Sequence, residues 1–159
     1  MTRRRAARFG AIQALYQAEL TGRQIEAVIL EFERHRLADL LEPLEGTGPR
    51  PEVDRVWFAT LTRGAWRQAP ELDPMIEATL AEGWSLQRAG YLLRAFLRAG
   101  AYELASKPDV PVSVVINEYV ELAHDFLSKD EARFINAVLD RLARQLRPDT
   151  DGPADPLTV

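Results

Sequence analysis

The chain has 159 residues, of which 47% are hydrophobic, and a formal net charge of -4. A chain of this length buries one substantial core, whereas two separate domains would each have little apolar surface, so we expect a single globular domain. The absence of cysteine excludes disulfide bonds and thiolate metal ligands, and it is typical of a protein in the reducing cytoplasm.

The charge is unevenly distributed, because the amino terminus is basic. Arginine stands at Arg3, Arg4, Arg5 and Arg8 with no acidic residue beside it. No apolar run of signal-peptide or membrane-spanning length follows, so we expect no membrane association. Since local potential rather than net charge attracts polyanions, a basic end on an acidic chain is compatible with nucleic-acid binding.

Apolar residues recur at helical spacing in almost every segment, and no segment alternates like a strand, so the sequence predicts an all-α fold. We expect about seven helices. The predicted helices cover residues 3–20, 24–41, 52–68, 74–82 and 86–106, a stretch that begins at 111, and 129–146.

Several of these boundaries carry recognisable caps. Gly22 is placed to end the first helix, since glycine readily adopts the left-handed conformation of a C-cap. Asp73 and Pro74 suit the cap and first position of the fourth helix. Ser128 and Glu131 match the capping-box pattern, which predicts that the seventh helix begins near position 129.

Proline and glycine are concentrated at 43–51, which predicts an exposed connection, and the acidic, proline-rich tail at 148–159 is expected to be disordered.

The apolar stripes also define a candidate core. The candidate core residues are Phe9, Ile12, Leu15, Tyr16, Ile25, Val28, Ile29, Phe32, Leu37, Leu86, Leu93, Phe96, Leu97, Leu104, Val112, Val115, Ile116, Tyr119, Val120, Ala123, Phe126, Leu127, Phe134, Ile135, Val138, Leu139 and Leu142.

Catalytic signatures are scarce: the chain has no glycine-rich phosphate loop, no H-E-x-x-H motif, and two histidines far apart. Glu118 and Glu121 share a helix face, but acids at this spacing are usually solvated. Asn117 and Asn136 interrupt apolar runs and are expected to be hydrogen-bonded amides that fix helix register. We therefore expect neither an enzyme nor a resident metal or cofactor.

The arginine cluster is the strongest functional signal among the residues. A guanidinium group stays charged, fits phosphate oxygens as a fork and stacks on bases. Positive charge at a helix N-terminus opposes the helix dipole, so the cluster calls for a functional explanation. On a continuous first helix, Arg5, Arg8 and Tyr16 can border a common surface, and cations beside an aromatic ring suit single-stranded nucleic acid.

Three segments carry a resemblance to a known family: "RRRAARFGAIQALYQAEL", "LLRAFLRAGAYELASKPDVPVSVVINEYVELAHDF" and "SKDEARFINAVLDRLA". Their order and spacing resemble the NusB family of bacterial transcription antitermination factors from Arg3 to about Arg147. The resemblance implies seven helices in two small bundles, packed as one compact domain over 1–147. The sequence departs from the family pattern at Ala6, where relatives carry arginine, and at Ala137, where many carry glycine.

The resemblance also implies a function. A protein of this kind binds the boxA element of ribosomal RNA leader transcripts together with NusE, the small-subunit ribosomal protein, and joins other Nus factors on RNA polymerase. Two alternatives are expected for Phe134: its side chain lies either in the core or on the surface that faces RNA. The residues that the resemblance assigns to RNA are Arg3, Arg4, Arg5, Arg8, Tyr16, Asp130 and Phe134.

Two other functions are compatible with the sequence. The chain can be a helical protein-protein adaptor without RNA contact, or an accessory domain related to those that precede some RNA methyltransferases. A homodimer is also possible, because apolar stripes do not distinguish a buried face from a face that binds a second copy.

Overall fold

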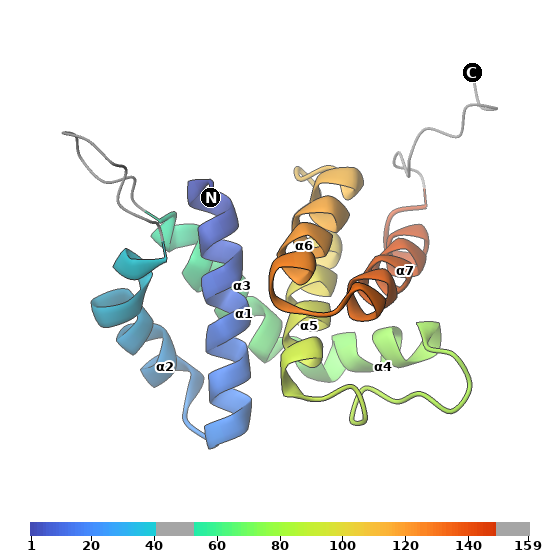
Figure 1. The fold of residues 1–159 in the computed structure, drawn as a ribbon, viewed down its shortest axis with the longest axis horizontal. Coiled ribbons are helices and arrows are strands. Elements are labelled where there is room, and N and C mark those ends of the chain that lie inside the picture. The colour runs from blue at the N-terminus through green and yellow to red at the C-terminus, as the bar shows by residue number, and fades with distance from the viewer. Residues whose placement is uncertain (41–52, 149–159) are drawn as a thin grey trace. The chain divides into compact units, whose positions relative to one another are not determined.

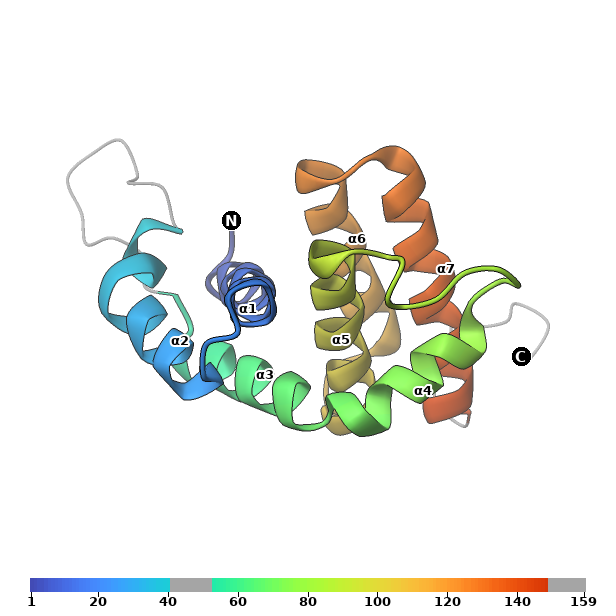
Figure 2. The same cartoon turned by 90° about the horizontal axis from the view of Figure 1, so that it is seen from below.

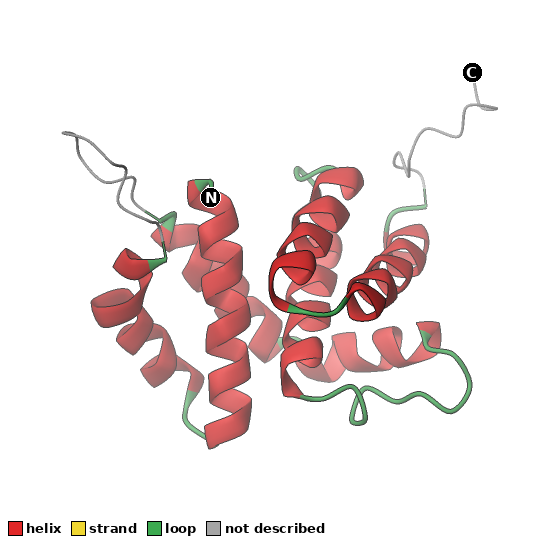
Figure 3. Cartoon of the chain, viewed as in Figure 1, coloured by secondary structure: helices red, strands yellow, loops and turns green. Residues whose placement is uncertain are grey.

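The computed structural model describes residues 1–40 and 53–148. These residues form seven α-helices and no strand, which confirms the all-α prediction (Figure 3). The predicted connection at 43–51 and nearly all of the predicted tail lie outside the described residues. The chain divides into an amino-terminal unit, Met1–Arg67, and a carboxy-terminal unit, Gln68–Val159.

The amino-terminal unit consists of α1 (Arg3–Thr21), α2 (Ile25–Glu31) and α3 (Arg55–Arg67), which pack against one another (Figure 1). The Thr2 hydroxyl caps α1 by accepting from the Arg5 backbone N–H at 3.1 Å. Gly22 ends the helix with a φ of 70°, and its N–H donates to the Ala18 carbonyl. The predicted extent and stop of the first helix are therefore confirmed.

The second predicted helix does not stay α-helical to its end. After α2 the chain forms a π-helical segment, η1 (Phe32–Arg36), and a 3-10 turn, η2 (Leu37–Asp39). In an α-helix, Phe32 and Leu37 would point about 140° apart. The wider π turn, in which the Leu37 N–H donates to the Phe32 carbonyl, brings both side chains to the core, where both are fully buried. Packing of both side chains in the core therefore explains why this segment is π-helical and not α-helical as predicted.

The carboxy-terminal unit consists of α4 (Ala69–Thr79), α5 (Tyr91–Ser106), α6 (Val112–Phe126) and α7 (Lys129–Leu146). Helix α5 contacts the other three, and α5, α6 and α7 lie side by side (Figure 2). Gly100 allows a close approach of α7, since a Cβ atom at this position would lie 2.9 Å from a methyl carbon of Leu139.

Two helix starts in this unit differ from the predictions. Helix α4 begins at Ala69, not at Pro74, which lies inside the helix. Asp73 does not cap it, because both of its carboxylate oxygens accept from Arg98 of α5, at 2.9 and 2.8 Å. Helix α5 begins at Tyr91 rather than at residue 86, because Gly90 has a φ of 84° and interrupts the helical backbone.

The last two helices follow the predictions more closely. Pro111 is the N-cap of α6 rather than its first residue. The predicted capping box of α7 is confirmed, with the Glu131 N–H donating to the Ser128 hydroxyl at 3.1 Å and the Ser128 N–H donating to the Glu131 carboxylate at 3.2 Å. The seventh helix has the predicted limits.

Some of the core predictions were wrong. Phe126 is 47% exposed at the end of α6. Phe134 is only half-buried, and its ring packs against Trp84 in the segment that follows α4. Asn117 and Asn136 are both exposed, so they do not fix helix register as buried amides, and the Asn117 amide donates to Glu121 one turn along α6 at 3.3 Å.

A buried arginine closes the end of this unit. Arg147 follows α7, is 9% exposed, and donates hydrogen bonds to backbone carbonyls at the end of α5 and in the α5–α6 connection. Burial lowers the pKa of the Arg147 guanidinium, and the charge of the Glu103 carboxylate opposes this shift. Glu103 is itself fully buried and accepts a hydrogen bond from the Tyr119 hydroxyl.

Candidate nucleic-acid interface

The predicted site residues fall in both units. The basic end of α1 belongs to the amino-terminal unit. Arg3 and Arg4 are exposed and Arg5 is half-buried, and the first turn contains no acidic side chain. The unpaired N–H groups of a helix start carry positive potential, which adds to the charge of the guanidinium groups. This end of α1 therefore attracts anions.

A tryptophan of α3 and the aspartate that precedes this helix contact the basic end. The Arg4 guanidinium lies 4.3 Å from the centre of the Trp57 ring, and its Nε is 3.9 Å from Oδ2 of Asp54. The other oxygen of Asp54 caps α3 by accepting from the Trp57 N–H at 2.9 Å. The Asp54 N–H donates to the Arg3 carbonyl at 3.3 Å, so the starts of α1 and α3 meet.

Two predicted residues occupy different places from those expected. Arg8 is 2% exposed, so the expectation that it lies open to solvent was wrong; its guanidinium lies 5.8 Å from the Trp57 ring. Tyr16 is half-buried three turns beyond Arg4, about 18 Å along the helix axis. The aromatic ring beside the first arginines is therefore Trp57, which sequence reasoning missed because no local pattern links it to Arg4.

The other predicted residues, Asp130 and Phe134, lie one turn apart on α7 in the carboxy-terminal unit. Asp130 is exposed. The Phe134 ring packs against Trp84, with ring centres 5.4 Å apart and planes inclined by 33°. Trp84 lies in the 80–90 loop between α4 and α5 and is 54% exposed. Sequence reasoning did not single out Trp84.

A pocket of about 360 Å³ lies beside these two rings, and we call it the Trp84 pocket. Its apolar lining is completed by residues of α5 and α7, and its polar lining comes from α7. Arg141 donates to the Thr79 carbonyl at 2.7 Å at the end of α4. The lining includes Trp84, Leu93, Asp130, Phe134, Val138 and Arg141.

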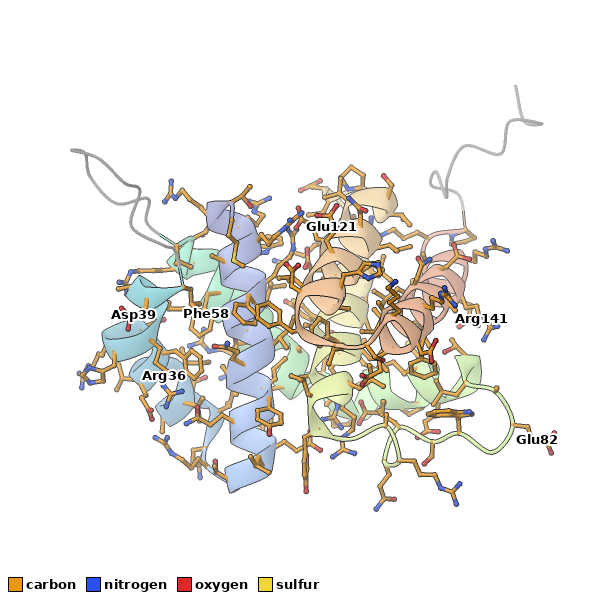
Figure 4. The ribbon with its side chains drawn as sticks, viewed as in Figure 1. Arg36, Asp39, Phe58, Glu82, Glu121 and Arg141 are labelled. Carbon is orange, nitrogen blue, oxygen red and sulfur yellow. The ribbon has the colours of Figure 1, made fainter. Side chains whose placement is uncertain are left out.

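The 80–90 loop is bonded to both α4 and α5 at residues 86 and 87. The Leu86 N–H donates to the Glu77 carboxylate of α4 at 2.7 Å, and the Leu86 side chain is buried. Arg94 of α5 donates to the carbonyls of Leu86 and Gln87, at 3.2 and 2.8 Å. Glu82, at the outer end of the loop, extends away from these anchors (Figure 4). Trp84 therefore lies two residues before the anchored part of the loop.

Two features are absent from residues 1–40 and 53–148. Among them, no three histidine, aspartate or glutamate side chains are grouped closely enough to hold a metal ion. No helix of this part of the chain combines the length and the apolar character that are needed to cross a bilayer.

Comparison with known proteins gives consistent results. The model of the NusB family matches residues 5–144. The transcription antitermination protein NusB of Bradyrhizobium sp. (strain ORS 278) is 46% identical over 151 residues, which are 95% of this chain and 88% of that protein. The solved structure of T. maritima NusB is 27% identical, with a TM-score of 0.70, and the match covers 91% of this chain and 92% of that chain.

A crystal structure of the antitermination factors NusB and NusE in complex with dsRNA has the same fold. The TM-score is 0.71 at 24% identity, over 89% of this chain and 96% of that chain.

Proposed function

Because the chain belongs to the NusB family, we propose that it is a transcription antitermination factor that binds RNA through the amino-terminal end of α1. Its RNA is the boxA element of ribosomal RNA leader transcripts, and it binds this element together with NusE. The assembly then joins other Nus factors on RNA polymerase. The role is binding rather than catalysis, and it takes place in the cytoplasm.

The observation that carries this proposal is the arrangement of arginines at the start of α1. Arg3, Arg4 and Arg5 gather positive charge at a helix start whose first turn contains no acidic residue, and the half-buried Asp54 lies 3.9 Å from Arg4. The Arg4 guanidinium stacks on Trp57, which restricts its rotamers and lowers the entropy lost when it binds a phosphate. We assign phosphate contacts to these three arginines.

The remaining predicted residues have different parts in the proposal. Arg8, which is buried, supports the basic end rather than contacting RNA directly. Tyr16 contacts only RNA that continues along α1. Asp130 and Phe134 belong to a second contact region, in which a carboxylate and an aromatic ring meet unpaired bases. Phosphate contacts supply affinity and base contacts supply sequence preference.

A salt titration tests the proposal. Fluorescence anisotropy of a labelled boxA-like RNA, with a scrambled RNA as comparison, is measured with and without NusE over a range of salt concentrations. Three phosphate contacts predict a slope of log K against log salt of about -2, at roughly -0.7 for each contact in single strands. Arg4→Ala is expected to weaken binding and to reduce the steepness of the slope by about 0.7.

Arg34 provides a matched control, since it is an exposed arginine of the same unit that lies on η1 rather than on α1. Arg34→Ala is expected to leave affinity and slope unchanged. Equal binding of both RNAs in the presence of NusE would contradict the proposed boxA preference. An affinity that is independent of salt and of Arg4 would instead support an adaptor without RNA contact.

A further inference from the structure

We propose that Arg55, the first residue of α3, binds the RNA backbone on one side of the boxA element and so lengthens the RNA path from α1 onto α3. This inference rests on the proposed RNA binding and deepens it, because it names a contact for the nucleotides that flank the element. Arg55 belongs neither to the arginine cluster of α1 nor to the residues that the family resemblance assigns to RNA.

Arg55 lies beside the basic end of α1 because the starts of α1 and α3 meet. Asp54, which directly precedes it, donates its N–H to the Arg3 carbonyl at 3.3 Å. The Asp54 carboxylate lies 3.9 Å from the Arg4 guanidinium. Since consecutive Cα atoms are only about 3.8 Å apart, the Arg55 backbone is one residue away from a contact with both arginines. An RNA strand that continues past Arg3 and Arg4 on this side therefore meets Arg55 next.

The Arg55 guanidinium is held in place and keeps donors for an anion. Its Nη1 donates to the Glu33 carbonyl of η1 at 2.7 Å, and the residue is exposed. A guanidinium group has several N–H donors, so a bond to one carbonyl leaves the others for phosphate oxygens. A side chain that is already held loses less entropy on binding a phosphate than one that rotates freely.

The other arginines of α3 differ from Arg55 in their partners. Arg63 and Arg67 both pair with the Glu26 carboxylate of α2, at 2.7 and 3.4 Å. Among residues 1–40 and 53–148, Arg55 has a backbone carbonyl as its partner and no carboxylate. The neighbouring Asp54 directs its oxygens to the Trp57 N–H and to Arg4, and the first turn of α3 contains no acid. Arg55 is therefore the arginine of α3 whose charge is available to a polyanion.

The test compares a core boxA-like RNA with RNAs that carry a short oligo(U) extension at the upstream end or at the downstream end. Affinities are measured by fluorescence anisotropy on the full chain with NusE. We expect one extension to strengthen binding and to steepen the slope of log K against log salt by about 0.7. At roughly -0.7 for one single-strand contact, the gain from this extension should fall about 2.6-fold between about 50 and about 200 mM salt.

Three variants assign the gain to the Arg55 charge. Arg55→Gln removes the charge but keeps an amide donor for the Glu33 carbonyl, and it is expected to make extended and core RNA bind alike. Arg55→Lys keeps a cation and is expected to retain most of the gain. Arg67→Gln is the matched control, since Arg67 is an exposed arginine in the last turn of the same helix, and it should retain the whole gain.

Three outcomes would overturn the inference. A gain that persists in Arg55→Gln shows that Arg55 does not contact the flanking RNA, even if both RNAs bind more weakly because η1 has lost an anchor. No gain from either extension, with core binding that still depends on Arg4, refutes the Arg55 contact and leaves the proposed function intact. Absence of RNA binding at every salt concentration refutes both the inference and the proposed function.

Discussion

Replacement of Arg147 by methionine removes the group that closes the end of the carboxy-terminal unit. Methionine keeps the apolar stem of the side chain but lacks the guanidinium N–H groups. In the unsubstituted protein these groups donate to backbone carbonyl oxygens at 2.5 to 3.0 Å. The affected carbonyls belong to Glu103, Leu104, Lys107 and Val110.

The expected loss of stability follows from these bonds. The carbonyls of Glu103 and Lys107 also accept from backbone N–H groups and keep those partners. The carbonyls of Leu104 and Val110 lose the bond from Arg147, and an unsatisfied buried polar group costs about 1–3 kcal/mol. Relief from burying a charge offsets part of this, because burial lowers the pKa of Arg147. We expect Arg147→Met to lower the free energy of unfolding by roughly 2–5 kcal/mol.

Urea denaturation followed by circular dichroism at the helix band measures this loss. Arg144→Met is the control, since Arg144 is an exposed residue of α7 that pairs with Asp140 one turn earlier at 3.1 Å. Removal of such a surface pair costs about 0.5 kcal/mol or less. Equal free energies of unfolding for the two variants would show that Arg147 does not anchor the end of α5, and the reasoning would be refuted.

Three further predictions concern single interactions. Ser128→Ala removes the cap of α7 and is expected to lower the free energy of unfolding by about 1 kcal/mol in the same urea assay; no change means that the capping box is not stabilising. Tyr119→Phe takes a donor from the buried Glu103 carboxylate, so a loss of about 1–3 kcal/mol is expected, and a more stable variant contradicts this. The hydrogen bond from Arg63 holds the pKa of Glu26 below its ordinary value of 4.5, so the contribution of this pair to stability is present above that pH and is lost as pH falls through the lowered pKa. In an NMR titration Arg63→Gln should raise the pKa of Glu26, and an unchanged value excludes Arg63 as the cause.

The helix ends that could be predicted are those fixed by neighbouring residues. The hydrogen bonds of the Ser128 capping box span three residues, and Gly22 closes α1 with a bond four residues back, so both are visible in a short window of sequence. The start of α4 was missed for the opposite reason. Asp73 is a residue type that often caps helices, but its carboxylate accepts hydrogen bonds from Arg98, 25 residues away.

In the candidate site, too, features set by neighbouring residues could be predicted and features set by tertiary contacts could not. The arginine cluster is contiguous and is evident from the sequence. Its aromatic neighbour is Trp57, 53 positions after Arg4, and only the packing of α1 against α3 brings them together. Burial of Arg8 also depends on tertiary structure, because periodicity alone does not distinguish it from Arg4 and Arg5. Likewise, Phe134 and Trp84 meet only because the 80–90 loop folds back toward α7.

Asp54 uses its two oxygens for separate contacts, and under the proposed phosphate contact of Arg4 this bears on how RNA would be exchanged. Oδ1 accepts from the Trp57 N–H, whereas Oδ2 faces the Arg4 guanidinium at 3.9 Å. An incoming phosphate can therefore replace Oδ2 as the counterion of Arg4 while the start of α3 keeps its cap. When the phosphate leaves, the same carboxylate takes its place again, so repeated association and dissociation require only a swap of anions and no refolding of either helix.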